Sequence, residues 1–284
     1  MTVLGSPESS AAAPATPVRL VDSHCHLNAD RFETDGVLVA EAARRVGVER
    51  LLVPGWNVAS SERALTLVDR LPWLDAAVGV HPHDAAKVDD AAFAAILDWA
   101  ARDQVVAIGE TGLDYDRVFS PIPDQLVNLR RNLALAASTG KPAILHCRSA
   151  TGRRDAQDAL LAEVRSMGAD APRLVIHSFS GPVDYAVAML DLGAVLSFSG
   201  LVFRRGEESS AEVAALAPID RVLVETDSPF LAPPGAPRSR NEPEWVRVTG
   251  AWLADRQRTT STALGATLVA TYDRLFPSPR RAPR

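Results

Sequence analysis

The chain has 284 residues, which is long for one small domain but fits a single barrel of roughly 250 residues. With 30 basic against 35 acidic residues, its net charge of -5 excludes an overall electrostatic attraction to nucleic acid or to an anionic membrane. The hydrophobic content of 47% excludes global disorder, and no apolar run reaches the length of about eighteen residues that a membrane-spanning helix needs. We therefore expect a globular protein with no membrane partner.

The two ends of the chain differ from its middle. Residues 1–17 are rich in Ala, Pro and Ser and lack the basic and apolar regions of a secretory signal, so they are predicted to be a disordered leader. One domain is predicted over residues 18–276, followed by a frayed tail at 277–284. Cys25 and Cys147 are too few for a disulfide framework, which favours free thiols in the cytoplasm. We expect the protein to be a monomer.

Short β-branched runs alternate with amphipathic stretches along the predicted domain, a pattern typical of βα units and a parallel sheet. Eight such runs are predicted to be strands: Val18–Asp22, Arg50–Pro54, Leu74–Val80, Val105–Gly109, Ala143–Leu145, Arg173–Ile176, Ala194–Ser197 and Arg221–Val224. Helices are predicted at Asp90–Asp103, Asp124–Thr139, Pro243–Asp255 and Ser261–Phe276. Since eight parallel strands close a barrel, the expected fold class is α/β, a single (β/α)8 TIM barrel.

Five of the eight predicted strands end in side chains that can bind a metal ion, at the rim where such barrels carry their active sites. The candidate ligands are His24, His26, Glu110, His146, His177 and Asp227. The spacing of His24 and His26 puts both imidazoles on one side of an extended segment. A single histidine at a strand end is usually a polar packing residue, but packing alone does not explain so many at one rim.

Four histidines and two carboxylates are more than one ion needs, so we expect two divalent metal ions as cofactors, with Glu110 between them. Mixed imidazole and carboxylate ligation accommodates Zn, Mn, Fe or Ni and by itself selects none of them. The expected ions are Mg, Mn or Zn. Asp22 and Glu225 lie two residues from candidate ligands and are predicted to orient imidazoles or the strand rim. A buried structural hydrogen bond is the alternative for both. The parity of Cys25 and Cys147 turns their thiols away from the ions.

Other side chains at the same rim are candidates for substrate binding. His81, in G-V-H-P-H, could approach a substrate oxygen, or it could belong to a turn before Pro82. Arginines follow several strands and could clamp a phosphate in a bidentate manner; they are Arg148, Arg204, Arg205, Arg238 and Arg240. Because nearly all basic residues of this chain are arginines, each of these arginines taken alone is expected to be a solvated side chain.

Seven motifs, in this order, resemble the TatD family of metal-dependent deoxyribonucleases: D-S-H-C-H, G-V-H-P-H, G-E-T-G-L-D, I-L-H-C-R, I-H-S-F-S-G, E-T-D-S-P and R-N-E-P. The resemblance covers residues 18–276. It implies a barrel of the amidohydrolase superfamily that hydrolyses phosphodiester bonds with divalent metal, typically as a 3'-5' exonuclease on DNA and sometimes RNA. DNA, or RNA, is thus the expected partner, as substrate.

The resemblance also implies how the ligands are divided and which residues meet the substrate. One ion would be held by His24, His26 and Asp227, the other by His146 and His177, with Glu110 between them. His81 and Arg148 resemble the family's substrate-side groups, whereas Arg204-Arg205-Gly206 replaces a Lys-Asn pair that many members carry. In the mechanism expected from this ligand set, the ions activate water and Asp227 accepts its proton, so Asp227 and Glu110 are the predicted catalytic residues.

Two other functions fit the same sequence. An amidohydrolase-type enzyme acting on a C-N or ester bond would use the same fold and ligands. Many such enzymes bridge their metals with a carboxylated lysine, but neither Lys87 nor Lys141 is placed to replace Glu110. A non-catalytic barrel could keep the metals for structure, although structural sites are usually closed and this one lies at an open rim.

Overall fold

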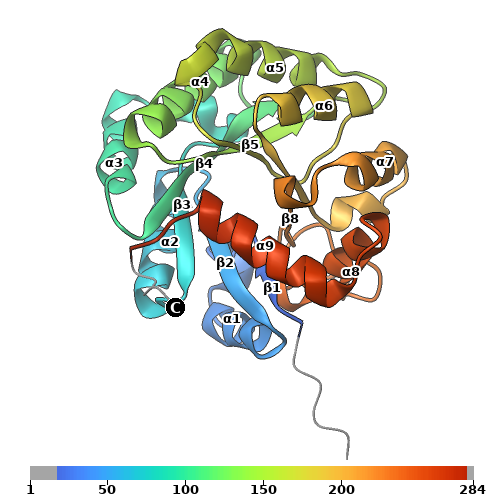
Figure 1. Cartoon of the computed structure of the whole chain (residues 1–284). Coiled ribbons are helices and arrows are strands. Elements are labelled where there is room, and N and C mark those ends of the chain that lie inside the picture. The colour runs from blue at the N-terminus through green and yellow to red at the C-terminus, as the bar shows by residue number, and fades with distance from the viewer. Residues whose placement is uncertain (1–17, 280–284) are drawn as a thin grey trace, which may run out of the picture.

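Eight parallel strands form one sheet in chain order, in a computed structural model that describes residues 18–279 (Figure 1). The strands are β1 (Leu20–Asp22), β2 (Val48–Pro54), β3 (Leu74–Val78), β4 (Val105–Asp114), β5 (Ala143–Arg148), β6 (Leu174–Ile176), β7 (Val195–Phe198) and β8 (Val222–Val224). The predicted leader, residues 1–17, and positions 280–284 of the predicted tail lie outside the described residues.

Hydrogen bonds between the first and last strands bring the sheet round into a nearly closed ring. The N–H of Ser23 donates to the carbonyl of Val224 at 3.1 Å. The Asp22 carboxylate accepts from both the N–H and the hydroxyl of Thr226, at 2.9 and 2.6 Å. The predicted α/β barrel is thereby confirmed. Asp22 joins the ends of the first and last strands through its hydrogen bonds with Thr226, and these bonds do not involve an imidazole.

Two strands extend further than predicted, and both carry candidate ligands. The fourth strand is predicted to end at Gly109, whereas β4 continues to Asp114. The fifth strand is predicted to end at Leu145, whereas β5 continues to Arg148. Glycine explains the difference at β4, because the run G-E-T-G looks like a turn. Gly112 instead allows close pairing, since a Cβ at this position would lie 1.9 Å from the carbonyl oxygen of His146.

Helices follow the strands and cover the outside of the barrel (Figure 1). They are α1 (Gly36–Arg45), α2 (Val58–Arg70), α3 (Asp90–Ala100), α4 (Ile122–Thr139), α5 (Asp155–Met167), α6 (Val183–Asp191), α7 (Glu208–Leu216), α8 (Val246–Arg256) and α9 (Ser261–Leu275). Helix α4 begins two residues before the predicted start because Pro123 fits its first turn. It ends as its sequence indicates, at Gly140 in the left-handed conformation (φ 66°).

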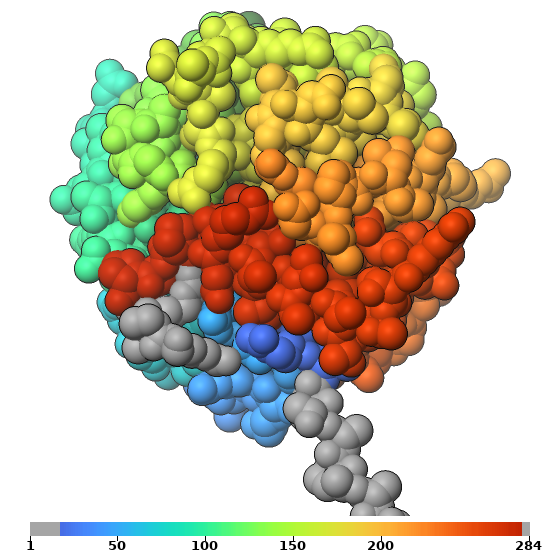
Figure 2. Space-filling view, viewed as in Figure 1, coloured from blue at the N-terminus to red at the C-terminus, as the bar shows by residue number. Residues whose placement is uncertain are grey.

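Helix α9 covers the end of the barrel where the strands begin. The hydroxyl of Tyr272 donates to the carboxylate of Asp75 in β3 at 3.0 Å, and Asp273 pairs with Arg50 of β2 at 2.7 Å. Gly265 permits the close approach of α9 to β1, because a Cβ there would lie 2.1 Å from the carbonyl oxygen of Arg19. In Figure 2 the residues of α9 form a red band across this face. The opposite end of the barrel is therefore the one that can hold a site.

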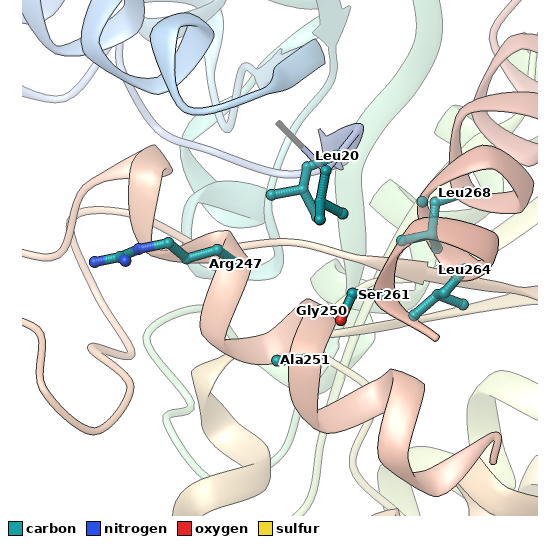
Figure 3. A pocket seen from close by; sticks show the side chains of 9 residues that line it. Leu20, Arg247, Gly250, Ala251, Ser261, Leu264 and Leu268 are labelled. Atoms are coloured by element: carbon teal, nitrogen blue, oxygen red, sulfur yellow. The ribbon is translucent and has the colours of Figure 1, made fainter. Parts of the chain in front are cut away.

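A small apolar hollow lies between β1, α8 and α9, with Leu20, Leu264 and Leu268 facing it (Figure 3). Its lining is mostly apolar and contains no histidine, carboxylate or cysteine. Across residues 18–279, each helix falls short of the length or the apolar character that crossing a bilayer would require.

Candidate metal centre

All six histidines of the chain lie in one group at the carboxyl-terminal end of the barrel. They come from the segments after β1 and β3, from β5, and from the residue after β6; they are His24, His26, His81, His83, His146 and His177. The rings of His24 and His177 stack with centroids 3.9 Å apart, and those of His81 and His146 meet edge to face at 4.6 Å. Segments far apart in the sequence therefore converge on one point, as the strand-end pattern predicts.

Four ligand atoms form a first cluster around one oxygen of Glu110. The Nε2 atoms of His24 and His26 lie 3.2 Å apart, and they lie 3.3 and 3.6 Å from Glu110 Oε2. Asp227 Oδ1 lies 3.8 and 3.4 Å from the same two nitrogens. A tetrahedral ion with bonds of about 2.1 Å holds its ligand atoms about 3.4 Å apart, so these four atoms fit one divalent cation.

A second cluster surrounds the other oxygen of the same carboxylate. Glu110 Oε1 lies 3.2 Å from His146 Nδ1 and 3.1 Å from His177 Nε2, and these two nitrogens are 3.4 Å apart. The spacing again matches ligands of one cation. Each oxygen of Glu110 thus belongs to its own set of imidazoles, and the centre could hold two ions.

The ring of His81 also faces this second cluster, with Nε2 3.4 Å from Glu110 Oε1. Its other nitrogen, Nδ1, accepts a hydrogen bond from the N–H of His83 at 3.1 Å. Burial lowers the pKa of His81 to about 4, so the ring is neutral near pH 7. A neutral ring that accepts at Nδ1 carries its proton on Nε2, which makes Nε2 a donor to an oxygen rather than a lone pair for a metal.

The backbone of β4 is displaced at Glu110. Pairing with β5 shifts register between Ile108 and Thr111, and the N–H of Glu110 donates to the carbonyl of Gly55 at 2.7 Å. Such a bulge redirects a side chain out of the regular alternation. Gly79 allows the displacement, because a Cβ there would lie 2.6 Å from the Cα of Gly109.

Hydrogen bonds between the segments after β1 and β8 hold the first cluster together. The N–H of His26 donates to the carbonyl of Ser228 at 2.8 Å, and the N–H of Asp227 donates to the carbonyl of His24 at 2.9 Å. Asp227 has a φ of 54°, a left-handed conformation that Asp and Asn tolerate better than most residues. The position of its carboxylate is therefore fixed by backbone geometry as well as by its neighbours.

Carboxylates behind the imidazoles fix the orientation of two rings. Glu225 Oε1 accepts from His177 Nδ1 at 2.9 Å, which leaves Nε2 of that ring for the cluster. Asp114 Oδ2 lies 3.2 Å from His146 Nε2 and 2.8 Å from His83 Nε2. Carboxylates in this position set the tautomer of a metal-binding histidine and raise its basicity.

Of these groups, Glu225 is among the site residues predicted from the sequence, whereas Asp114 and His83 are not. Asp114 carries a usable signal: like the predicted ligands it is a metal-binding type of side chain at the carboxyl-terminal end of a strand, but the predicted strand ends at Gly109. The sequence signal for His83 is weaker, because this residue lies in a 3-10 helix (Pro82–Lys87), where strand alternation does not apply.

The electrostatics of the centre favour a cation. Burial alone raises the pKa of Glu110, but the imidazoles of His81, His177 and His24 outweigh burial and hold that pKa well below its usual range. The carboxylate therefore stays ionised although its side chain is only 4% exposed. Buried anionic carboxylates among imidazoles form a donor set that suits divalent metals, whose charge offsets the cost of burial.

The predicted phosphate-binding arginines differ in their surroundings. The guanidinium of Arg240 forms ion pairs with Asp35 at 2.8 Å and with Glu242 at 2.6 Å. These pairs hold the segment after β8 in place. Arg148 lies 2.5 Å from the carboxylate of Asp116. Arg204, Arg205 and Arg238 are exposed. The two cysteines are buried, and neither belongs to a cluster that could hold a metal in the described part of the chain.

Replacing Asp114 with Asn is expected to lower metal affinity and hydrolysis about 10- to 100-fold, because His146 loses the charged partner that orients it. Titration of the apo protein with Zn or Mn, together with rate measurements, checks this result. The exposed Asp98 of α3 provides the matched control Asp98→Asn, which should change neither. Equal metal affinity in wild type and Asp114→Asn would remove Asp114 from this role.

Comparison with known proteins gives a consistent result. The family model described as TatD related DNase matches residues 21–277. A metal-dependent hydrolase of Bacillus subtilis, YabD, is 34% identical over 257 residues, covering 90% of this chain and 98% of that protein. The 3'-5' ssDNA/RNA exonuclease TatD of Klebsiella pneumoniae is 36% identical over 233 residues, covering 80% and 86%.

Among solved structures, that of YjjV, a TatD homologue from Escherichia coli K12, superposes with a TM-score of 0.82 at 29% identity. The match covers 92% of this chain and 99% of that one. The barrel, the clustered histidines and carboxylates, and the family match over nearly the whole described chain agree. This protein belongs to the TatD family of metal-dependent hydrolases.

Proposed function

We propose that the protein is a nuclease that hydrolyses phosphodiester bonds with two divalent ions, Mg, Mn or Zn, as a 3'-5' exonuclease on single-stranded DNA and also RNA. The observation that carries this proposal is Glu110, whose two carboxylate oxygens face different imidazoles of one continuous group: Oε2 lies near His24, and Oε1 lies near His146 and His177. Paired metals sharing a carboxylate are suited to in-line displacement at phosphorus. The relative from Klebsiella pneumoniae, named as an exonuclease on single-stranded DNA and RNA, supports the substrate class.

In this proposal His24, His26 and Asp227 would hold one ion, His146 and His177 would hold the other, and Glu110 would serve both. Bound there, the ions would act as Lewis acids that polarise the phosphoryl oxygens and lower the pKa of a water molecule. Glu225 and Asp114 keep the rings of His177 and His146 in place through the hydrogen bonds described above. The site thus positions its own ligands before substrate arrives.

Asp227 is the proposed proton acceptor. Burial raises its pKa, but the hydrogen bond from His26 and the charge of His177 outweigh burial and hold the pKa below its usual value. The carboxylate is therefore ionised near pH 7 and can take a proton from the attacking water. His81, with its proton on Nε2, would donate to a phosphoryl oxygen, while Arg148 and Arg205 would contact the phosphate backbone.

The positions of the lysines argue against the amidohydrolase alternative. Lys87 Nζ pairs with Asp84 at 2.6 Å, and Lys141 Nζ donates to the carbonyls of Ala100 and Arg102 at 2.5 and 3.1 Å. Both amines are thus engaged outside the two clusters, so a carboxylated lysine cannot take the bridging position of Glu110. The alternative remains an arm of the test below.

The test uses single-stranded DNA labelled at its 5' end, incubated with the protein and with Mg, Mn or Zn in turn. A ladder that shortens from the 3' end, and that a phosphorothioate at the 3'-terminal linkage suppresses, is the expected result. Single-stranded RNA, duplex DNA and a cyclic amide are assayed in parallel. Cleavage of the cyclic amide without cleavage of any nucleic acid would overturn the proposal in favour of the amidohydrolase alternative.

Removing the ions is expected to lower the unfolding temperature by about 10 °C, because ligands at a thousand times their Kd stabilise the folded state by about 4 kcal/mol. Differential scanning calorimetry before and after chelation measures the shift. Adding back the metal should restore both the unfolding temperature and hydrolysis. An unfolding temperature that does not depend on metal would contradict binding at this buried centre.

A further inference from the structure

Two large aromatic rings are exposed at the end of the barrel that holds the metal centre. Phe119, in the segment after β4, is 68% exposed, and Phe230, in the segment after β8, is 51% exposed. A phenyl ring left in water forgoes the stabilisation that burial would give it. The stability of the fold therefore does not account for two exposed phenyl rings beside the clusters, and we consider a role in binding.

Each phenyl ring contacts the imidazole ring of a histidine in the metal centre. The ring of Phe119 meets that of His83 edge to face, with centroids 4.7 Å apart and planes at 89°. The ring of Phe230 meets that of His26 in a similar way, at 6.0 Å and 71°. Each phenyl ring meets its histidine roughly at right angles and keeps at least half of its surface exposed, so it has apolar surface available to another flat group.

The backbone holds both phenylalanines in place through residues of the centre. Asp114 Oδ1 accepts from the N–H of Arg117 at 2.7 Å, and the carbonyl of Arg117 accepts from the N–H of Phe119 at 2.8 Å. The N–H of Phe230 donates to the carbonyl of Asp227 at 2.8 Å, and its own carbonyl accepts from Asn241 Nδ2 at 2.7 Å. The rings are therefore anchored relative to the clusters rather than carried on unattached loops.

The strand order puts the two rings on opposite sides of the centre. In a ring of eight strands taken in sequence, β4 and β8 face each other across the barrel axis. The metal-binding side chains lie between the ends of these strands, with Glu110 in β4 and Asp227 just after β8. A chain of nucleotides that crosses the centre would meet one phenylalanine on each side.

We propose that Phe119 and Phe230 stack against the bases on the two sides of the scissile phosphodiester and so make the site selective for single strands. The inference rests on the proposed function and names how that site recognises its substrate. Unpaired bases stack on aromatic side chains irrespective of their sequence, whereas bases in a duplex are already stacked on each other. With a net charge of -5, the protein gains little affinity from the phosphate backbone, so stacking has more to contribute.

The test compares wild type with Phe119→Leu and Phe230→Leu on two single-stranded oligonucleotides. One is intact, and the other has abasic residues at its two 3'-terminal positions. Leucine keeps an apolar cover over His83 or His26 and removes only the aromatic face. Leu97→Ala, at a 49% exposed position on α3, is the control, and thermal melting verifies that every variant is folded.

Each phenylalanine variant is expected to raise KM for the intact strand about tenfold, with kcat changed less than about twofold. On the abasic strand the variants and wild type should have the same KM, because there is no base to stack. An unchanged KM on the intact strand would overturn the proposal. An equal rise of KM on both strands would also overturn it, because the rings would then shape the site without contacting bases.

Equilibrium binding of the same oligonucleotides, followed by fluorescence anisotropy, separates this proposal from the proposed function. Wild type should bind the intact strand about a hundredfold more tightly than the abasic one, because two stacking contacts of about tenfold each are lost, and each variant should keep only about a tenfold difference. The absence of a difference in wild type overturns stacking, whatever is cleaved. If wild type binds with the expected difference but hydrolyses no strand with any metal, stacking holds and the nuclease assignment fails.

Discussion

Glu110→Gln is expected to release metal from both clusters and to lower hydrolysis about a thousandfold, which corresponds to the several kcal/mol that bound ions contribute. The amide has the size of the carboxylate but lacks its negative charge, and it can offer only one oxygen to the two clusters. Because Glu110 Oε1 and Oε2 face different imidazoles, one substitution disturbs both. Metal content by inductively coupled plasma mass spectrometry, with hydrolysis rates, measures the effect.

The exposed Glu212 of α7 supplies the matched control, and Glu212→Gln should keep full metal content and rate. If Glu110→Gln kept two ions per chain, Glu110 would not be the shared ligand. If it lost one ion and kept the other, the clusters would bind independently, and the two-metal arrangement would need another bridge.

Asp227→Asn is expected to lower hydrolysis about 10²- to 10⁴-fold while the fold is retained. Asparagine tolerates the left-handed backbone of this position and keeps an oxygen for the metal, but it cannot accept a proton. The loss should appear in kcat rather than in KM, and thermal melting should show a folded protein. Steady-state kinetics on the single-stranded substrate provide the measurement.

Asp191→Asn, at the exposed end of α6, is the control for this substitution and should have wild-type kinetics. Full hydrolysis by Asp227→Asn with full metal content would show that another group takes the proton. Loss of one ion together with activity would instead make Asp227 chiefly a ligand, a distinction that metal analysis of the same sample provides.

Much of the fold could be predicted because most strand residues are buried, so that the strands form short, mainly apolar runs. In β2 and β3, for example, Leu51–Val53 and Leu74–Val78 are buried throughout. The carboxyl-terminal end of β4 could not be predicted, since the second half of this strand contains polar residues and glycine that resemble a turn. These residues belong to the strand because of the neighbouring strand β5. Position 112, for example, must be glycine because a Cβ there would collide with the backbone carbonyl of His146. Pairing between strands is not visible in one sequence.

The candidate ligands could be predicted because strand ends meet at one rim and alternation gives each side chain a direction. The grouping into two clusters could not be worked out in this way, because it depends on a bulge that turns Glu110 out of the alternation. Asp114 and His83 were missed for a related reason. Asp114 lies within hydrogen-bond distance of both His83 and His146, and only the folded chain brings these three segments together.

The helix that seals the far end of the barrel also affects turnover. Buried side chains fill the interior of the barrel and α9 is bonded across the starts of β2 and β3, so substrate and product share the carboxyl-terminal end where the metal centre lies. A released fragment therefore occupies the path of the next substrate molecule until it diffuses away. The enzyme should dissociate from its substrate often between cuts, and accumulated product should act as a competitive inhibitor.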